Sequence, residues 1–377
     1  MQYVMLRDVC SINMGQSPDS NSYNEEGRGI PFFQGNADFG ERYPVVRQWC
    51  DSPVKMAAAK DILISVRAPI GAINYASEKC CIGRGLAAIT PDLSKVSENY
   101  IFWLLKSKHD ELNRKGTGST FKAIGRKALE EIQVPDIPLD EQNKCGMLLE
   151  KVYGIIQRHQ QEIQAFDTLI KARFVEMFGD VVINDKGWVN YRFSDIASSR
   201  LGKMLDAKQQ TGLHKYPYLA NFNVQWMSFN LENLNQMDFD ENDQHEFALE
   251  DGDLLICEGG EIGRCAIWHK QIEPCFFQKA LHRVRCNPDN VIPEYLAWWF
   301  RYNSEHGGFE KIAGAKATIA HLPGVKLKAL QVVVPQLDLQ NQFAAFVSEV
   351  DKSKAVVQKA LDEAQLLFNK LMQEYFG

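Results

Sequence analysis

The sequence predicts an α+β protein with a duplicated, pseudo-twofold organisation: two similar α/β domains separated by two long antiparallel helices that form a coiled coil. Three observations predict it. Short motifs recur in the same order in both halves of the 377 residues, a proline-free heptad pattern follows each set, and β-type runs alternate with helical stretches inside each half. We therefore expect domains at 1–138 and 181–336, a central long helix at 139–180 and a C-terminal long helix at 337–377.

Several motif pairs carry the repeat. The run DILIS at 61–65 returns as DLLIC at 253–257, and Ile-Gly at 70–71 returns at 262–263 with the same offset. Because such matches keep their order along the chain, a duplicated unit explains them better than chance does. The other pairs are 6–9 with 193–196, 99–103 with 294–298, and 176–179 with 374–377.

The first part of each repeat has the pattern of a compact α+β domain. Short β-type runs at 62–66, 86–89, 254–257 and 332–334 are separated by glycine and proline. Helical stretches at 97–112 and 293–302 lie between them. Short β-branched runs with turn residues on either side are typical of strands.

The second part of each repeat has the heptad spacing of a coiled coil. Alternating steps of four and three residues from Cys145 fall mostly on apolar side chains, and the same steps in the second tail do so too. Each tail begins with acidic residues just after Pro138 or Pro335, which suits a helix N-terminus. An alternative stays open, in which each helix packs only on its own domain. The predicted seam consists of Leu149, Val152, Ile156, Ile163, Phe166 and Ile170 in the first helix and Val347, Val350, Val357, Leu361, Phe368 and Leu371 in the second.

Composition excludes some classes of protein. The chain carries 42 Lys and Arg against 48 Asp and Glu, a net charge of −6, so it does not coat nucleic acid by bulk charge, although a local basic face is compatible with this total. No apolar run of about eighteen residues occurs, which argues against a membrane span. The start of the chain lacks a signal-peptide pattern, so we expect a cytoplasmic protein.

The nine cysteines include no CxxC pair, so we expect reduced thiols and no metal. A zinc site at Cys257, Cys265, Cys275 and Cys286 with His269 or His282 is the disfavoured alternative. The known phosphate-loop, metalloprotease, serine-hydrolase and dinucleotide-binding motifs are also absent from the sequence. We therefore expect neither catalysis nor a cofactor in this chain.

Positive charge is concentrated in two stretches. Five basic residues and no acidic residue occur between Arg114 and Lys127, around a segment rich in Gly, Ser and Thr. The corresponding stretch at 311–328 also has no acidic residue. Small residues admit a phosphate close to the backbone, and Lys and Arg neutralise it, which favours DNA binding over a plain surface loop. The candidates are Lys115, Thr117, Ser119, Thr120, Lys122 and Arg126 in the first stretch and Lys316, Thr318 and His321 in the second.

Further polar residues stand at matching places in the two repeats and are candidates for contacts with bases. Arg, Asn and Gln are the side chains that read base edges most often. Each candidate is also a plausible turn cap or surface residue. They are Gln34 and Asn36 with Asn221 and Asn223, Arg67 with Arg264 beside the Ile-Gly step, and Arg84 with Lys279 before the next strand.

The ordered motifs resemble those of the specificity subunit of a type I restriction–modification system, over essentially the whole chain. The resemblance rests on 60–65, Ile-Gly at 70–71, Gly-Ser-Thr at 118–120, IQVP at 132–135 and Phe-Gly at 178–179. The second repeat carries VPQLDLQ at 334–340 and ends in Phe-Gly at 376–377. It departs at 315–317, where Ala-Lys-Ala replaces Ser-Thr-Phe.

The resemblance implies two target-recognition domains, each of which reads one half of a bipartite site in double-stranded DNA, with the helix pair setting the spacer between the halves. Such subunits have no activity alone. They recruit two modification methyltransferase subunits, which bind S-adenosylmethionine and methylate adenine. They also recruit a restriction subunit that uses ATP and Mg and cuts the DNA.

Two other classes of function stay open from the sequence. A stand-alone DNA-binding regulator with coiled-coil helices would bind its site tightly without any methyltransferase subunit. An enzyme of unrecognised type, with an active site between the domains, would show turnover by the purified chain.

Overall fold

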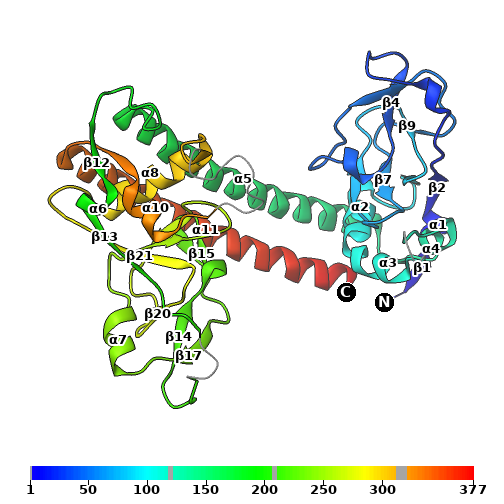
Figure 1. Ribbon diagram of the computed structural model, residues 1–377. Coiled ribbons are helices and arrows are strands. Elements are labelled where there is room, and N and C mark those ends of the chain that lie inside the picture. The colour runs from blue at the N-terminus through cyan, green and yellow to red at the C-terminus, as the bar shows by residue number, and fades with distance from the viewer. Residues whose placement is uncertain (1, 118–121, 206–209, 311–320) are drawn as a thin grey trace. The chain divides into compact units, whose positions relative to one another are not determined.

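The computed structural model describes residues 2–117, 122–205, 210–310 and 321–377. The chain divides into two compact units (Figure 1). Unit 1 contains Met1–Gln161 and Val357–Gly377, and unit 2 contains Glu162–Val356. Each unit therefore holds one α+β domain together with parts of both long helices, which confirms the predicted fold class.

Unit 1 is built on a four-stranded antiparallel sheet of order β2-β10-β7-β8. The central strand β7 (Ile62–Ser65) is buried along its whole length, as expected for an ILIS run inside a sheet. Strand β7 lies between β10 (Leu86–Pro91) and the edge strand β8 (Ile73–Tyr75), and β2 (Cys10–Met14) pairs with β10 at the other edge.

A second sheet in unit 1 has the order β3-β5-β4-β9-β6, and β1 pairs with β11. Among the helices of this domain, α2 contributes the most side chains to the core, because six of its ten residues are buried. The remaining strands are β1 (Tyr3–Met5), β3 (Tyr23–Asn24), β4 (Ile30–Phe33), β5 (Gln48–Cys50), β6 (Met56–Ala57), β9 (Cys80–Ile82) and β11 (Gln133–Pro135). The helices of this domain are α1 (Leu6–Val9), α2 (Glu98–Ser107), α3 (His109–Lys115), α4 (Arg126–Glu130) and the short η1 (Ser20–Ser22) and η2 (Asn36–Asp38).

Unit 2 repeats the four-stranded sheet as β13-β21-β18-β19. Strand β18 (Leu254–Cys257) is again buried along its length and lies between β21 (Leu281–Cys286) and the edge strand β19 (Cys265–Ile267). The other strands are β12 (Val189–Arg192), β13 (Ala197–Leu201), β14 (Lys215–Leu219), β15 (Val224–Gln225), β16 (Ser228–Phe229), β17 (Asn235–Asp238), β20 (Phe276–Phe277) and β22 (Gln331–Val334). The helices are α6 (Phe193–Ile196), η4 (Asn221–Asn223), α7 (Glu241–Phe247), α8 (Pro293–Glu305) and α10 (Gly324–Ala329).

The two long helices are α5 (Leu139–Phe178) and α11 (Leu337–Phe376), and they pack together in both units. In unit 1, Tyr153 of α5 lies 5.9 Å from Phe368 of α11 between ring centroids. In unit 2, Lys354 of α11 forms an ion pair with Asp167 of α5 at 2.7 Å. The early part of α5 thus meets the late part of α11, and the late part of α5 meets the early part of α11, so the helices run antiparallel.

The residues predicted for the helix seam all lie buried or half-buried. The heptad phase, however, changes near the end of α5. The four-and-three step falls on Arg173, which is only half-buried, whereas Phe174 is 1% exposed. Phe174 contacts Tyr295 of α8 as well as Phe343 of α11. Helix α5 therefore packs on its domain and on α11 at the same time, which widens the apolar face beyond a two-helix seam.

Two buried glutamines fasten the starts of the long helices to the domains. In unit 1, the Gln142 side chain accepts a hydrogen bond from the Ser97 N–H at 2.9 Å, just before α2. In unit 2, Gln340 accepts one from the Ile292 N–H at 3.0 Å, just before α8. A buried amide needs such partners, so these contacts fix each helix start against its domain.

Among the described helices, none is long and apolar enough to cross a membrane.

Candidate nucleic-acid interface

The candidate residues of unit 1 gather where β2 and β7 end and β10 begins, which is one edge of the antiparallel sheet. Backbone hydrogen bonds tie the three segments together. The Gly15 N–H donates to the Leu86 carbonyl at 2.9 Å, and the Val66 N–H donates to the Gly85 carbonyl at 2.9 Å. Arg84 precedes β10 and Arg67 follows β7, so both stand at this edge.

Gln34 joins this edge through a serine. The Gln34 amide and the Ser17 hydroxyl form a hydrogen bond of 3.0 Å, and the same hydroxyl accepts one from the Arg84 N–H at 3.3 Å. The side chains of Gln34 and Arg84 are exposed. Asn36 opens η2 close by and is half-buried. The Gln34 amide, which has both a donor and an acceptor, therefore shares a serine with the backbone of Arg84.

The basic stretch of unit 1 pairs with the same edge. Arg67 forms a bridge with Ala123, Ala123 forms another with Thr117, and the Ala68 N–H donates to the Lys122 carbonyl at 3.1 Å. Lys122 and Thr117 are therefore next to Arg67. We call Gln34, Arg67, Arg84, Thr117 and Lys122 the unit 1 strip. Ser119 and Thr120 lie outside the described residues.

The cations of this stretch differ in their partners. Lys115 forms an ion pair with Glu111 at 2.6 Å, and Arg126 forms one with Glu130 at 2.7 Å, each within its own helix. Arg67, Arg84 and Lys122 are exposed and have no ion pair with any described residue. Their charge is therefore available to an anion, whereas a ligand would compete with a carboxylate for Lys115 and Arg126.

The candidates of unit 2 occupy the corresponding edge, where β13 and β18 end and β21 begins. The Gly202 N–H donates to the Leu281 carbonyl at 3.0 Å, and the Glu258 N–H donates to the Ala280 carbonyl at 2.9 Å. Lys279 precedes β21 and is exposed. His321 forms a bridge with Gly259 and is also exposed. Lys316 and Thr318 lie outside the described residues.

An open groove of about 640 Å³ runs along this edge of unit 2. Lys203 in its wall is engaged in an ion pair with Asp243, and Arg200 with Glu246. Lys279 and Lys328 line the same groove without an ion pair among the described residues. The groove therefore offers free positive charge next to neutralised pairs.

Two asparagines of unit 2 have different surroundings. The Asn221 amide donates to the Gly259 carbonyl at 2.9 Å, and its oxygen accepts from the Arg264 guanidinium at 2.6 Å. Asn223 is 1% exposed, accepts from the Ala220 N–H and donates to the Asn230 carbonyl. The expectation that Asn223 reads a base is corrected by this geometry, because its amide serves the turn. The sequence signal, Asn after a strand, is the same for a cap and a contact.

The backbone hydrogen bonds also set which residues of the two units are equivalent. The carbonyls of Gly85 and Ala280 accept equivalent backbone hydrogen bonds, from Val66 and Glu258 respectively. Arg84, which precedes Gly85, therefore corresponds to Lys279, which precedes Ala280, as the sequence predicted. Val66 and Glu258 likewise correspond, so the residue equivalent to Arg67 is Gly259. The sequence pairing of Arg67 with Arg264 is therefore corrected. Ala123 corresponds to His321, which forms the same bridge.

The cysteines form no metal centre among the described residues, in which no group of three or more His, Cys, Asp and Glu side chains is placed to hold a metal ion. All nine cysteines are free thiols and eight are buried. Burial raises the pKa of Cys275 to about 12 and that of Cys286 to about 12. In the metal-free protein these buried side chains are therefore thiols.

Comparison with known proteins identifies related sequences. The family model for the type I restriction modification DNA specificity domain matches residues 1–165 and 185–365. A crystal structure of the type I restriction-modification system S subunit from M. genitalium is similar over 100% of this chain and 96% of that chain, with a TM-score of 0.65 and 15% identity. At that identity the likeness shows a shared fold.

Two specificity subunits of Methanocaldococcus jannaschii match shorter segments. The MjaX subunit is 44% identical over 151 residues, which is 40% of this chain and 36% of that protein. The MjaIX subunit is 24% identical over 223 residues, which is 52% of this chain and 51% of that protein. The chain thus matches about a third to a half of the length of these relatives.

Proposed function

The chain belongs to the type I restriction–modification DNA specificity family, and we propose that it acts in the cytoplasm as the specificity subunit of such a system. Each domain reads one half of a bipartite site in double-stranded DNA. The helix pair sets the spacer and docks two modification methyltransferase subunits, and a restriction subunit completes the assembly. The chain itself is not catalytic; S-adenosylmethionine is bound by the modification subunits, and ATP with Mg by the restriction subunit.

The single observation that carries this proposal is the equivalence of the two strand edges. Arg84 and Lys279 each precede the residue whose carbonyl accepts the equivalent backbone hydrogen bond, are exposed, and have no ion pair with any described residue. Cations held on rigid strand ends, next to amide and hydroxyl groups, suit phosphate and base contacts. Two such edges with different neighbouring side chains favour a site made of two different halves.

The helices support the docking and spacing parts of the proposal. Met147 is 56% exposed on α5, and Leu366 is 72% exposed on α11. Large exposed apolar side chains on long helices are typical of protein interfaces. A helix changes length by about 1.5 Å per residue, so its length can set a distance in steps.

Co-expression tests the proposal. The chain is produced with the modification subunits encoded beside it, and methylated adenines are mapped across the host genome. We expect a motif of two half-sites with a fixed spacer. One heptad inserted in phase into both α5 and α11 should keep both half-sites and lengthen the spacer by about three base pairs.

A continuous motif, or a spacer that the insertion leaves unchanged, would contradict the proposal. Tight binding to one site by the chain alone, with no methylation under co-expression, would instead favour the stand-alone regulator. The matched control is a heptad inserted into α5 only, which should break the pairing with α11 and abolish methylation.

A further inference from the structure

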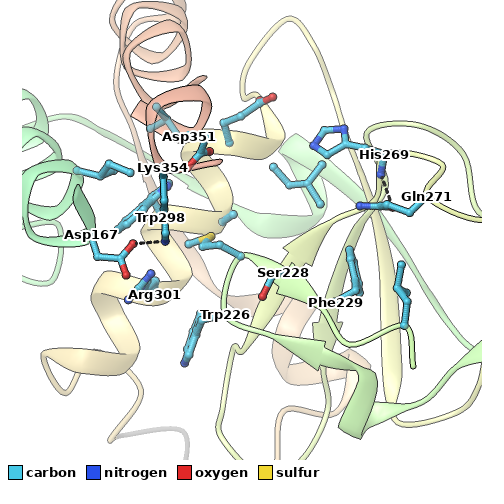
Figure 2. Close-up of a pocket in the computed structure, with 17 residues that line it drawn as sticks. Asp167, Trp226, Ser228, Phe229, His269, Gln271, Trp298, Arg301, Asp351 and Lys354 are labelled. Carbon is cyan, nitrogen blue, oxygen red and sulfur yellow. Dashed lines mark hydrogen bonds and ion pairs between the residues drawn. The ribbon is translucent and has the colours of Figure 1, made fainter. Parts of the chain in front are cut away.

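One aromatic side chain of unit 2 is exposed to solvent without a structural task. Phe222 of η4 is 55% exposed and makes no ring contact with any described residue. The two aromatic residues that follow it, Trp226 and Phe229, line a cavity of about 540 Å³ (Figure 2). Trp226 donates to the Glu261 carboxylate at 2.7 Å. Phe229 packs on Trp268 with ring centroids 5.3 Å apart. Internal contacts therefore explain Trp226 and Phe229 but not Phe222.

The residues on both sides of Phe222 hold its turn in place. The Asn221 amide donates to the Gly259 carbonyl at 2.9 Å, and its oxygen accepts from the Arg264 guanidinium at 2.6 Å. Asn223 is 1% exposed and accepts from a backbone N–H of the same turn at 2.9 Å. Because the backbone is fixed at both neighbours, a ligand that meets the Phe222 ring has little backbone freedom to immobilise.

The turn that carries Phe222 lies on the strand edge proposed for DNA contacts. The N–H of the residue just before Lys279 donates to the Leu219 carbonyl at 2.9 Å, where the chain enters the turn. Gly259, to which the turn is hydrogen-bonded, forms a bridge with His321. The turn therefore joins the two segments that present Lys279 and His321.

A cation without a counter-charge lies against the same turn. The Arg264 guanidinium also donates to the Asn221 backbone carbonyl at 3.1 Å. Arg264 is half-buried and has no ion pair with any described residue, and its Nε has no hydrogen-bond partner. Such a guanidinium favours the approach of an anion, which DNA supplies as phosphate. One turn thus combines an exposed ring with a positive charge.

Unit 1 has the same turn without the ring. Helix η2 follows the cap residue Gly35 and η4 follows the cap residue Ala220. In both turns the side chain of the third residue accepts from the N–H of that cap residue. This alignment places Ala37, which is also exposed, where Phe222 stands in unit 2. The framework is repeated and the exposed side chain differs, as expected for a residue that reads only one half-site.

Double-stranded DNA offers apolar surface in two places. Thymine carries a C5-methyl group in the open major groove, whereas the faces of the bases are covered by their stacked neighbours. A contact with the methyl group needs no distortion of the duplex, but insertion between bases must first unstack a step. The methyl group is therefore the partner that costs least for a ring on a fixed turn. Phenylalanine makes this contact in DNA-binding proteins.

We propose that Phe222 is a specificity-determining residue that packs on the C5-methyl group of a thymine in the half-site read by unit 2. The inference rests on the proposed function, because it requires the unit 2 edge to face DNA. Cytosine has no methyl group at this place, so the contact favours a T·A pair over a C·G pair. Each half-site that contains a methylated adenine also contains a thymine on the opposite strand.

Removal of one methyl group from the DNA tests the contact. The complex of the chain with its modification subunits is titrated with its DNA site, in which each thymine in turn is replaced by deoxyuridine. We expect a thymine at which the replacement weakens binding about fourfold, the ratio for one buried methyl group.

The same titrations with variants of Phe222 assign the effect to its ring. Phe222→Ala should weaken binding to the unmodified site by about tenfold and reduce the deoxyuridine effect at that thymine to less than about 1.5-fold. Phe222→Leu keeps an apolar side chain and should retain a deoxyuridine effect of about twofold. Deoxyuridine effects at other thymines should be the same in all three proteins.

Two controls separate this contact from other causes. Ile183 is 73% exposed in the turn after α5, and Ile183→Ala should leave every deoxyuridine effect unchanged. If Ile183→Ala removed the same effect, that effect would not report a contact of Phe222. Phe222→Ala should change the melting temperature by at most about 1 °C, because an exposed side chain contributes little to folding. Loss of binding through a large drop in melting temperature would assign Phe222 to folding instead.

Other outcomes would overturn the proposal. Deoxyuridine effects that Phe222→Ala leaves unchanged would show that the ring contacts no thymine methyl group. A rise in 2-aminopurine fluorescence that Phe222→Ala removes would report unstacking and make the ring a wedge. Loss of copurification with the modification subunits in Phe222→Ala would make the ring a protein contact.

Failure of this inference is distinguishable from failure of the proposed function. If the complex methylates a bipartite site and Phe222→Ala alters no deoxyuridine effect, only the role of Phe222 is wrong. If the complex neither binds nor methylates such a site, the proposed function is wrong, and the role of Phe222 with it.

Discussion

The two units share a backbone framework and differ in the side chains placed on it. In unit 1 the Val66 N–H donates to the Gly85 carbonyl, and in unit 2 Glu258 donates to Ala280 in the same way. On this common edge, however, Arg67 faces Ala123 in one unit, whereas Gly259 faces His321 in the other. Buried strands maintain the framework while exposed ends vary, which is how one fold can carry two different recognition surfaces.

The same contrast extends to the domain side facing the long helices. In unit 1 the guanidinium of Arg42, a loop residue, lies 5.0 Å from the ring centroid of Trp103, whereas in unit 2 the guanidinium of Arg301, a residue of α8 itself, lies 5.0 Å from the ring centroid of Trp298. Duplication therefore preserved the architecture of this side but not its internal contacts. The two units should respond differently to equivalent substitutions, and the following predictions use that difference.

The largest difference is expected in stability at the same helical position. Phe174 of α5 is 1% exposed and packs on Phe178, Tyr295 and Phe343, so Phe174→Ala should destabilise unit 2 by about 3–5 kcal/mol. The residue at the same place in α11 is Met372, which is only half-buried in unit 1. Met372→Ala should cost at most about 2 kcal/mol. Hydrogen exchange of each unit under increasing urea measures both losses of stability. Equal losses would show that the two helix ends contribute equally to the stability of their units.

The long helices and the duplication could be predicted because their signals are periodic. Heptad spacing repeats over both tails, so one misplaced residue does not hide it, and α5 and α11 begin at Leu139 and Leu337 just after the predicted boundary. Arg84 and Lys279 could be matched because each precedes a buried strand whose register is tightly set.

Features that depend on packing between distant segments could not be predicted. Arg42 is a single arginine in a loop, and nothing in the sequence places it on Phe102. Arg67 was matched with Arg264 because both lie beside the Ile-Gly step, but Arg67 precedes that step and Arg264 follows it, and the true equivalent is Gly259. The predicted heptad phase was wrong near Arg173 because α8 also packs on α5, a contact that no local sequence pattern indicates.

A smaller effect should separate free from paired cations in DNA binding. Lys122 has no ion pair with any described residue, whereas Arg126 is held by Glu130 at 2.7 Å. Lys122→Ala should weaken binding to all sequences by on the order of 1–2 kcal/mol and lower the salt slope by about 0.9. Arg126→Ala should change the slope less, and the double variant should show little more than Lys122→Ala.

The same measurement compares the two units. Arg84→Ala and Lys279→Ala remove equivalent charges and should each lower the slope by about 0.9. Titration of the assembled complex with DNA at several salt concentrations gives all of these slopes. A slope that stays constant in Lys122→Ala, Arg84→Ala and Lys279→Ala would show that the strand edges do not contact phosphate.

The smallest difference concerns pH. His282 of β21 is 1% exposed, and its ring forms a hydrogen bond of 3.1 Å with the Leu322 carbonyl. The equivalent residue of unit 1 is Ala87, which does not titrate. Burial lowers the pKa of His282, although the Leu322 carbonyl opposes this. Because an unfolded histidine has a pKa of about 6.5, the unfolded chain binds a proton below that pH before folded His282 does.

The stabilisation from neutral His282 is therefore complete above about pH 6.5 and is lost as the pH falls towards its lowered folded value. Each pKa unit of lowering corresponds to about 1.4 kcal/mol. Unfolding of unit 2 should become easier between about pH 7.5 and about pH 5.5, and His282→Gln, which can still donate to the Leu322 carbonyl, should reduce that dependence. Exchange measured in unit 1 of the same samples is the internal control. If His282→Gln retains the full pH dependence of the stability of unit 2, another group causes that dependence. The replacement of Ala87 by His282 would then not explain why the two units differ in their response to pH.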